Sequence, residues 1–271
     1  MKETQHPDTW AAGDLYEPFM GRWSRLAARL FVHWLAASPE IDWLDIGCGT
    51  GALTQAVLDD GHPRSVAGID PSPGFVAHAS AHITGGRTGF SVGNAQHLPF
   101  RTNAFGATIS GLVLNFLPQP AQAVTEMARV TQPGGIVAAY VWDYTEKMEF
   151  LRIFWDVVAE LDPDANQFDE GQRFFLSQPK ALIEVLTDAG LDKVEVQPID
   201  FPTIFRDFAD YWSPFLGGQG PAAGYVMSTD RKHRNRLRER IRFRLPFAED
   251  GSIPLAARAW GVRGRTVKAQ S

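Results

Sequence analysis

One short segment constrains the fold of this chain more than any other. Residues 43–51 read Trp-Leu-Asp-Ile-Gly-Cys-Gly-Thr-Gly, an apolar run that contains one acid and leads into three alternating glycines. The apolar residues suit a buried parallel strand, and glycines lack the β-carbon that would keep a ligand away from backbone amides. Helical spacing of apolar residues resumes at Leu53. A strand, a glycine turn and a helix N-terminus together predict a cradle for a nucleotide-like cofactor.

Strand-like and helix-like segments alternate through the first half of the chain. An amphipathic helix is expected over 23–35, where apolar residues recur at spacings of three and four. The segments that follow are strands over 41–46, 65–70, 88–92, 105–114 and 135–142, and helices over 52–59, from 71 onward and over 121–130. Such alternation predicts an α/β fold with a doubly wound, mostly parallel sheet.

The second half of the chain lacks the regular alternation of strands and helices, and its pattern predicts an additional helical region. Helices are expected over 150–161 and 179–189, and strands over 194–199 and 255–262. About fifty residues rich in aromatics, glycine and arginine separate these two strands, which is a natural place for a lid. The predicted organisation is an N-terminal helical cap (1–40), a cofactor-binding core (41–200), a helical lid or substrate insertion (201–254), and the last strand with its tail (255–271).

Charge and composition exclude several classes of protein. The net charge of -5 argues against a general nucleic-acid binder, which would carry a basic excess. A single cysteine, Cys48, permits no internal disulfide, and no apolar run reaches the roughly 18 residues of a membrane span. We therefore expect a cytoplasmic protein. The basic segment 231–244 is open to two interpretations, a solvated lid helix or a surface for nucleic acid or an acidic partner.

The glycine turn alone fits two classes of cofactor. Gly47, Gly49 and Ala52 follow the dinucleotide-binding spacing, and Asp70 stands where such enzymes place a ribose-binding acid, so an NAD-dependent oxidoreductase is one alternative. Asp45 favours a cofactor that carries a positive charge, because a carboxylate beside the turn would repel a pyrophosphate and attract an ammonium group.

Five segments in order resemble the motifs of class I S-adenosylmethionine-dependent methyltransferases. Residues 45–51 and 68–72 resemble the first two motifs, 94–100 the third, and 112–116 with 129–135 the fourth and fifth. Their spacing is similar to that of the subgroup with a type 11 methyltransferase domain, which includes the quinone C-methyltransferases. The resemblance implies a Rossmann-like seven-stranded sheet with a helical lid insertion before the last strand. It also implies S-adenosylmethionine as cofactor, a small-molecule methyl acceptor, and a monomer or homodimer.

The resemblance also implies roles for individual residues. Gly47, Gly49 and Thr50 would line the methionine end of the cofactor, Asp45 would orient its amino group, and Asp70 would accept both ribose hydroxyls. The full set of expected cofactor-binding residues is Tyr16, Arg22, Asp45, Gly47, Cys48, Gly49, Thr50, Gly51, Asp70, Pro71, Asn94, Ala95, Gln96 and Ser110. A structural alternative for Asp70 is an N-cap of the following helix.

The adenine position departs from the family pattern. Asn94 stands where an acid is more common, and its amide oxygen would accept from the exocyclic amine of adenine without a charge. Asn94 also motivates a third hypothesis, a module that binds S-adenosylmethionine without turnover.

The acceptor site is less constrained than the cofactor site. Asn115, Asp143 and Tyr144 follow the expected strands at the end where the methyl group should emerge, so they are the candidates for orienting or deprotonating a substrate. Methyl transfer from a sulfonium needs no metal and no covalent residue, and no metal site is expected. The aromatic residues of the second half favour a small apolar or aromatic metabolite as acceptor, although core packing explains many of them equally well.

Overall fold

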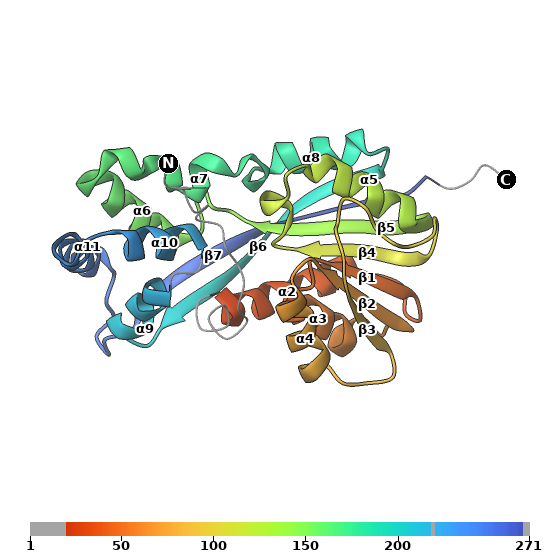
Figure 1. Ribbon diagram of the computed structural model, residues 1–271, viewed down its shortest axis with the longest axis horizontal. Coiled ribbons are helices and arrows are strands. Elements are labelled where there is room, and N and C mark those ends of the chain that lie inside the picture. Colours follow the sequence, from red (N-terminus) through yellow and green to blue (C-terminus); the bar gives the residue numbers. More distant parts are fainter. Residues whose placement is uncertain (1–19, 218–219, 268–271) are drawn as a thin grey trace. The chain divides into compact units, whose positions relative to one another are not determined.

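The computed structural model describes residues 20–217 and 220–267 (Figure 1). By internal contacts the chain forms two compact units. The larger unit contains Gly21–Val141, Leu176–Ile199 and the chain from Ala259 onward, and the smaller unit contains Trp142–Phe175 and Asp200–Arg258. The helix expected near the start is present as α2 (Arg22–Leu35), whereas Tyr16 lies outside the described residues.

The strands form one seven-stranded sheet in the order β3-β2-β1-β4-β5-β7-β6. The pairs β1–β2, β1–β4, β2–β3 and β4–β5 are parallel. The strands are β1 (Asp42–Ile46), β2 (Ser65–Asp70), β3 (Thr88–Val92), β4 (Phe105–Gly111), β5 (Thr131–Trp142), β6 (Asp192–Phe205) and β7 (Ile253–Arg265). The mostly parallel, Rossmann-like sheet predicted from the sequence is confirmed.

Helices cover both faces of the sheet in the larger unit. These helices are α2 with α3 (Ala52–Asp60) and α4 (Pro73–His82), and α5 (Pro120–Val130) with α8 (Pro179–Asp188) (Figure 1). Leu44 and Ile46 of β1 belong to an apolar cluster that also contains Val124 of α5 and Leu182 of α8. Trp43, their neighbour on the other side of the strand, is also fully buried. Because parallel sheets need both faces covered, β1 is buried from Trp43 to Ile46, and Asp45 is the polar side chain among these four residues.

The fourth strand ends earlier than the expected range of 105–114. β4 stops at Gly111, and Leu112 has a φ of +66°, a left-handed conformation that cannot continue a strand. Its amide still donates to the Tyr140 carbonyl, at 2.8 Å, before Leu114–Phe116 form one turn of 3₁₀ helix. Leu114 is buried although it lies beyond the strand. The apolar residues therefore continue past the end of β4, which explains why the expected range was too long.

The smaller unit is built from helices and an aromatic core. Its helices are α6 (Glu149–Leu161), α7 (Glu170–Arg173), α9 (Phe208–Trp212), α10 (Gly220–Ser228) and α11 (Arg231–Arg244). Phe154 and Phe215 stack with ring centroids 4.7 Å apart, and Tyr225 packs edge-on against Phe154. These rings therefore pack against one another as a core. No helix in the described part of the chain is long and apolar enough to cross a lipid bilayer.

Candidate functional site

The glycine turn is held rigidly between β1 and β2. The amides of Gly47 and Cys48 both donate to the Ile69 carbonyl, at 2.7 and 3.1 Å. Gly47, Gly49 and Gly51 have φ values of +68°, +53° and +92°, a conformation that favours glycine. A β-carbon would lie 2.3 Å from the Val113 side chain at Gly47 and 2.1 Å from the Ile83 side chain at Gly51, but at Gly49 its closest neighbour would be 4.0 Å away. Packing and the positive φ values together favour glycine at the outer positions, whereas at Gly49 the described residues leave room beside the backbone for a ligand atom.

Asp45 presents a buried carboxylate oxygen without a partner. The side chain is fully buried at the end of β1, and its Oδ2 accepts a hydrogen bond from the Thr54 hydroxyl at 2.6 Å. Its Oδ1 has no hydrogen-bond partner among the residues that the structure describes. Burial raises the pKa of Asp45 to about 7, with a smaller upward contribution from the charge of Asp70 and an opposing one from Thr54. A lone carboxylate oxygen in such surroundings is costly, and a cationic donor would offset that cost.

Thr54 is a part of this site that the sequence analysis missed. It is fully buried on α3, one helical turn after the glycines, and it directs its hydroxyl to Asp45. One feature of the sequence could have indicated it. Thr54 is a polar residue on the same buried side of the helix as Leu53 and Val57.

Asp70 lies beside the turn at the end of β2. Its Oδ2 accepts from the Gly49 amide at 3.0 Å, and its Oδ1 accepts from the Ser72 amide at 2.9 Å. Burial raises the pKa of Asp70, and these two amide hydrogen bonds act in the opposite direction. The helix cap considered for Asp70 belongs to Ser72, whose hydroxyl accepts from the Phe75 amide. Each Asp70 oxygen retains a further lone pair for a ligand hydroxyl.

The segment after β3 is an exposed turn followed by buried residues. Asn94 is exposed, and its Oδ1 accepts from the Gln96 amide at 2.9 Å. Ala95 and Gln96 are buried behind it. The amide oxygen of Asn94 thus already accepts a hydrogen bond within the turn. A ligand donor would have to bind to the same oxygen beside this contact.

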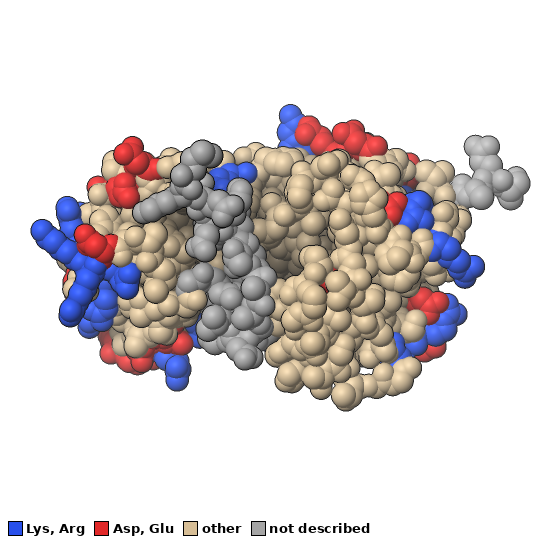
Figure 2. Space-filling view, viewed as in Figure 1, with Lys and Arg blue, Asp and Glu red and all other residues tan. Residues whose placement is uncertain are grey.

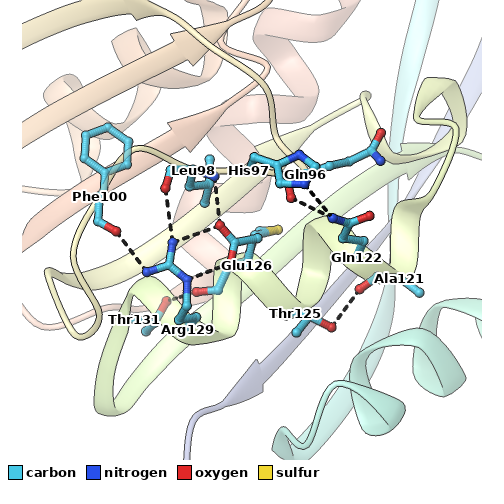
Figure 3. A network of polar contacts seen from close by, with 11 residues as sticks. Gln96, His97, Leu98, Phe100, Ala121, Gln122, Thr125, Glu126, Arg129 and Thr131 are labelled. Atoms are coloured by element: carbon cyan, nitrogen blue, oxygen red, sulfur yellow. Dashed lines mark hydrogen bonds and ion pairs between the residues drawn. The ribbon is translucent and has the colours of Figure 1, made fainter.

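Helix α5 holds the rest of that segment through hydrogen bonds that Glu126 and Arg129, which pair with each other, form with the backbone of Leu98 and Phe100 (Figure 3). Arg129 donates to the carbonyls of Phe100 and Leu98, at 2.9 and 3.1 Å, and it pairs with Glu126 at 2.6 Å. Glu126 in turn accepts from the Leu98 amide at 2.8 Å. The sequence pattern marked Arg129 as part of a motif without indicating this structural role.

Ser110 and Asn115 lie at and beyond the end of β4. Ser110 pairs in register with Ile46 and donates its hydroxyl to the Ile46 carbonyl at 2.9 Å, which places it next to the glycine turn. Asn115 has its Nδ2 3.4 Å from the Ser177 hydroxyl, and its buried Oδ1 has no hydrogen-bond partner among residues 20–217 and 220–267. Asn115 therefore offers a free acceptor oxygen.

The other two acceptor-side candidates belong to the smaller unit. Asp143 is almost fully buried, accepts from the Glu146 amide at 3.0 Å, and has its pKa raised by burial. Tyr144 is buried with its ring centroid 5.4 Å from that of Phe174.

The remaining expected residues differ in exposure. Burial and the nearby carboxylates raise the pKa of the Cys48 thiol, so it stays protonated. Thr50 is buried, Pro71 is exposed, and the Arg22 guanidinium lies 4.4 Å over the Trp23 ring. No group of three or more His, Cys, Asp or Glu side chains in the described ranges could hold a metal ion.

Known proteins match the part of the chain that contains the glycine turn. Residues 44–139 match the family model of the methyltransferase domain. A demethylmenaquinone methyltransferase of Lactiplantibacillus plantarum is 30% identical over 177 residues, which are 58% of this chain and 73% of the relative.

Solved structures share the fold at low sequence identity. A Bacillus halodurans protein described as a methyltransferase has a TM-score of 0.58 at 18% identity, over 89% of this chain and 99% of the other. A phosphoethanolamine N-methyltransferase of Haemonchus contortus, solved with phosphomonomethylethanolamine and S-adenosylhomocysteine, has a TM-score of 0.59 at 15% identity, over 94% of this chain and 57% of the other.

Site and relatives together decide between the cofactors considered. Asp45 Oδ1 has no hydrogen-bond partner among the described residues, so this carboxyl can accept from a cationic donor, and S-adenosylmethionine carries an ammonium group. A phosphate-bearing dinucleotide would meet the charge of Asp45 instead. The chain belongs to the class I S-adenosylmethionine-dependent methyltransferases, in the subgroup that carries the type 11 methyltransferase domain.

Proposed function

We propose that this methyltransferase acts on a small apolar or aromatic metabolite, with a quinone-like ring as the first class to test. Support comes from the L. plantarum relative, whose name specifies a quinone as its acceptor. The planar, weakly polar ring of a quinone also suits the apolar acceptor expected from the sequence. The observation that carries the cofactor half of the proposal is the buried, unpartnered Oδ1 of Asp45 beside the open middle glycine.

The proposed cofactor contacts follow from the geometry around the turn. Asp45 would accept from the amino group of the methionine end, which would approach over Gly49. Asp70, with one lone pair free on each oxygen, would accept from the two ribose hydroxyls. The adenine would lie toward Asn94, Ala95 and Gln96. The other residues proposed to line the cofactor are Tyr16, Arg22, Gly47, Cys48, Thr50, Gly51, Pro71 and Ser110.

S-adenosylmethionine supplies an electrophilic methyl group on a sulfonium, so the protein mainly positions the acceptor and excludes water. Alignment of a bound nucleophile with that methyl group is worth about 7 to 11 kcal/mol of barrier lowering. Asn115 would orient the acceptor through its unpartnered Oδ1. Asp143 and Tyr144 are further candidates, and the raised pKa of Asp143 suits a group that takes up a proton.

We assign functions to the same ranges of the chain that the sequence predicted as domains. Residues 41–200 would bind the cofactor, with 255–271 completing the sheet, and 201–254 would cover the acceptor as a helical lid. The cap over 1–40 would include α2.

The cofactor assignment is tested by calorimetric titration of S-adenosylhomocysteine into an Asp70→Ala variant. The dissociation constant should rise at least tenfold, which is about 1.4 kcal/mol. Asp188→Ala is the matched control, because Asp188 is an exposed acid at the end of α8. Equal affinities for the Asp70 variant and the unmodified enzyme would contradict the ribose contact.

The acceptor class is tested by transfer of a labelled methyl group to a panel of small compounds. Naphthoquinols, benzoquinols and phenols should become labelled in preference to amines, carboxylates and RNA. Asn115→Ala should lower kcat while leaving the affinity for S-adenosylhomocysteine unchanged, since the residue would touch the acceptor alone. Labelling confined to amines or RNA would refute the proposed substrate class and leave the cofactor assignment intact.

A further inference from the structure

Helix α11 concentrates positive charge in an otherwise acidic chain. Eight of its 14 residues are lysine or arginine and one is glutamate, whereas the whole chain has a net charge of -5. Asp230 caps the helix by accepting from the His233 amide at 2.7 Å, and Leu237 and Ile241 are its buried residues. Figure 2 shows the basic side chains gathered where Figure 1 places α11.

Part of this charge is used within the smaller unit. Arg240 and Arg244 pair with Glu160 at the end of α6, and Arg238 pairs with Glu239. Arg238 and Arg242 also lie over the Phe208 ring, at 5.0 and 5.3 Å from its centroid. The contacts with Glu160 and Phe208 fasten the helix to its own unit.

A second group of cations faces solvent without such partners. Arg231, Lys232 and Arg236 are exposed, and they form no ion pair with any residue that the structure describes. Lys232 and Arg236 are four residues apart and therefore lie on one helix face. Free, solvated cations on one face are able to interact with a partner of opposite charge.

The same face carries an aromatic side chain that the fold leaves in water. Phe243 is 84% exposed, and it lines a shallow groove of about 520 Å³ together with Arg236 and Arg240. Leu161, Glu160 and Glu239 complete the lining of this groove. Phe247, just beyond the helix, is 42% exposed. An aromatic ring that borders cations and has no core to enter is typical of segments that lie in a membrane interface.

We propose that the outward face of α11, formed by Lys232, Arg236 and Phe243, docks on the surface of an anionic lipid bilayer. The free cations would neutralise lipid phosphates, and the Phe243 ring would enter the boundary between headgroups and acyl chains. Nucleic acid fits this surface less well, because single-strand binding uses successive aromatic platforms along a basic groove. Here Phe243 is the single aromatic side chain among the described residues that line the groove. If the acceptor is apolar as proposed above, docking would bring the enzyme to the phase in which that acceptor accumulates.

The proposal is tested by cosedimentation of the full chain with lipid vesicles. The protein should bind vesicles of phosphatidylcholine mixed with phosphatidylglycerol and should not bind phosphatidylcholine alone. Raising the salt from about 0.1 M to about 1 M should release most of the protein, since the Debye length falls from about 10 Å to about 3 Å. The double variant Lys232→Glu, Arg236→Glu should lower the partition coefficient at least tenfold, about 1.4 kcal/mol.

Two matched controls test whether binding depends on this particular surface or only on the net charge and the exposed apolar area of the protein. Lys180→Glu, Lys193→Glu makes the same change of charge at exposed lysines of the larger unit and should leave binding unchanged. Phe243→Ala should weaken binding, whereas Phe175→Ala, at a ring that is 63% exposed, should not. Equal losses in both charge variants, or α11-dependent binding to poly(U) RNA without binding to anionic vesicles, would overturn the proposal. Transfer to soluble acceptors is measured separately, so failure here leaves the methyltransferase assignment untouched.

Discussion

Replacing Asp45 by asparagine should make the cofactor-free enzyme more stable and disable it. The Asp45 carboxyl has its pKa raised from 3.8 to about 7 because it is buried. Between these two values the unfolded chain ionises the group while the folded chain keeps it protonated, so rising pH favours unfolding. The shift of about three pKa units corresponds to about 4 kcal/mol of stability that is lost once the pH exceeds 7. The neutral amide of the variant would keep the contact with Thr54 and avoid this loss.

The test is urea unfolding of both proteins without cofactor, followed by tryptophan fluorescence. The stability advantage of Asp45→Asn should grow from about 1 kcal/mol near pH 4.5 to about 4 kcal/mol near pH 8. An exposed control, Asp188→Asn, should show no such growth. The same Asp45 variant should bind S-adenosylhomocysteine at least tenfold more weakly, because the charged partner of the ligand ammonium is gone. A stability difference that does not change with pH, or a variant that is less stable near pH 8, would refute the reasoning.

Two further predictions concern the turn and its surroundings. Gly49→Ala should lower the free energy of unfolding by only about 1 to 2 kcal/mol, the cost of a left-handed alanine, because its β-carbon would meet no described atom closer than 4.0 Å. It should nevertheless weaken S-adenosylhomocysteine binding in calorimetry, and unaltered affinity would argue against ligand approach at this glycine. Arg129→Ala should lower the free energy of unfolding by about 2 kcal/mol and speed amide hydrogen exchange over residues 96–100, because it removes charged hydrogen bonds to Leu98 and Phe100. Exchange that stays as slow as in the unmodified enzyme would show that Arg129 does not hold this segment in place.

The sequence predicted best what depends on local pattern. The ranges 65–70 and 88–92 coincide with β2 and β3, because short segments that contain β-branched or aromatic residues between glycine, proline and polar residues leave few alternatives. The family resemblance implied that Asp45, Asp70 and the glycine turn act together, and the hydrogen bond from the Gly49 amide to Asp70 shows that Asp70 lies beside the turn.

Features that depend on contacts distant in sequence were not predictable in the same way. β6 runs to Phe205 instead of ending near 199, and its later residues alternate between buried and exposed only because of neighbours elsewhere in the chain. The hydrogen bond from Thr54 to Asp45 and the contacts of Arg129 with Leu98 likewise join separate elements. Local propensity carries no information about such partners.

The buried position of Cys48 determines how this enzyme responds to oxidants and alkylating drugs. It is the sole thiol of the chain, it lies within the glycine turn, and only 5% of it is exposed. A reagent must open the turn to reach it, and a protonated thiol is a poor nucleophile even then. The folded enzyme should therefore tolerate peroxide and iodoacetamide. Oxidation of this cysteine therefore cannot regulate methylation in the folded enzyme. Selective inhibitors must bind noncovalently or react with other side chains.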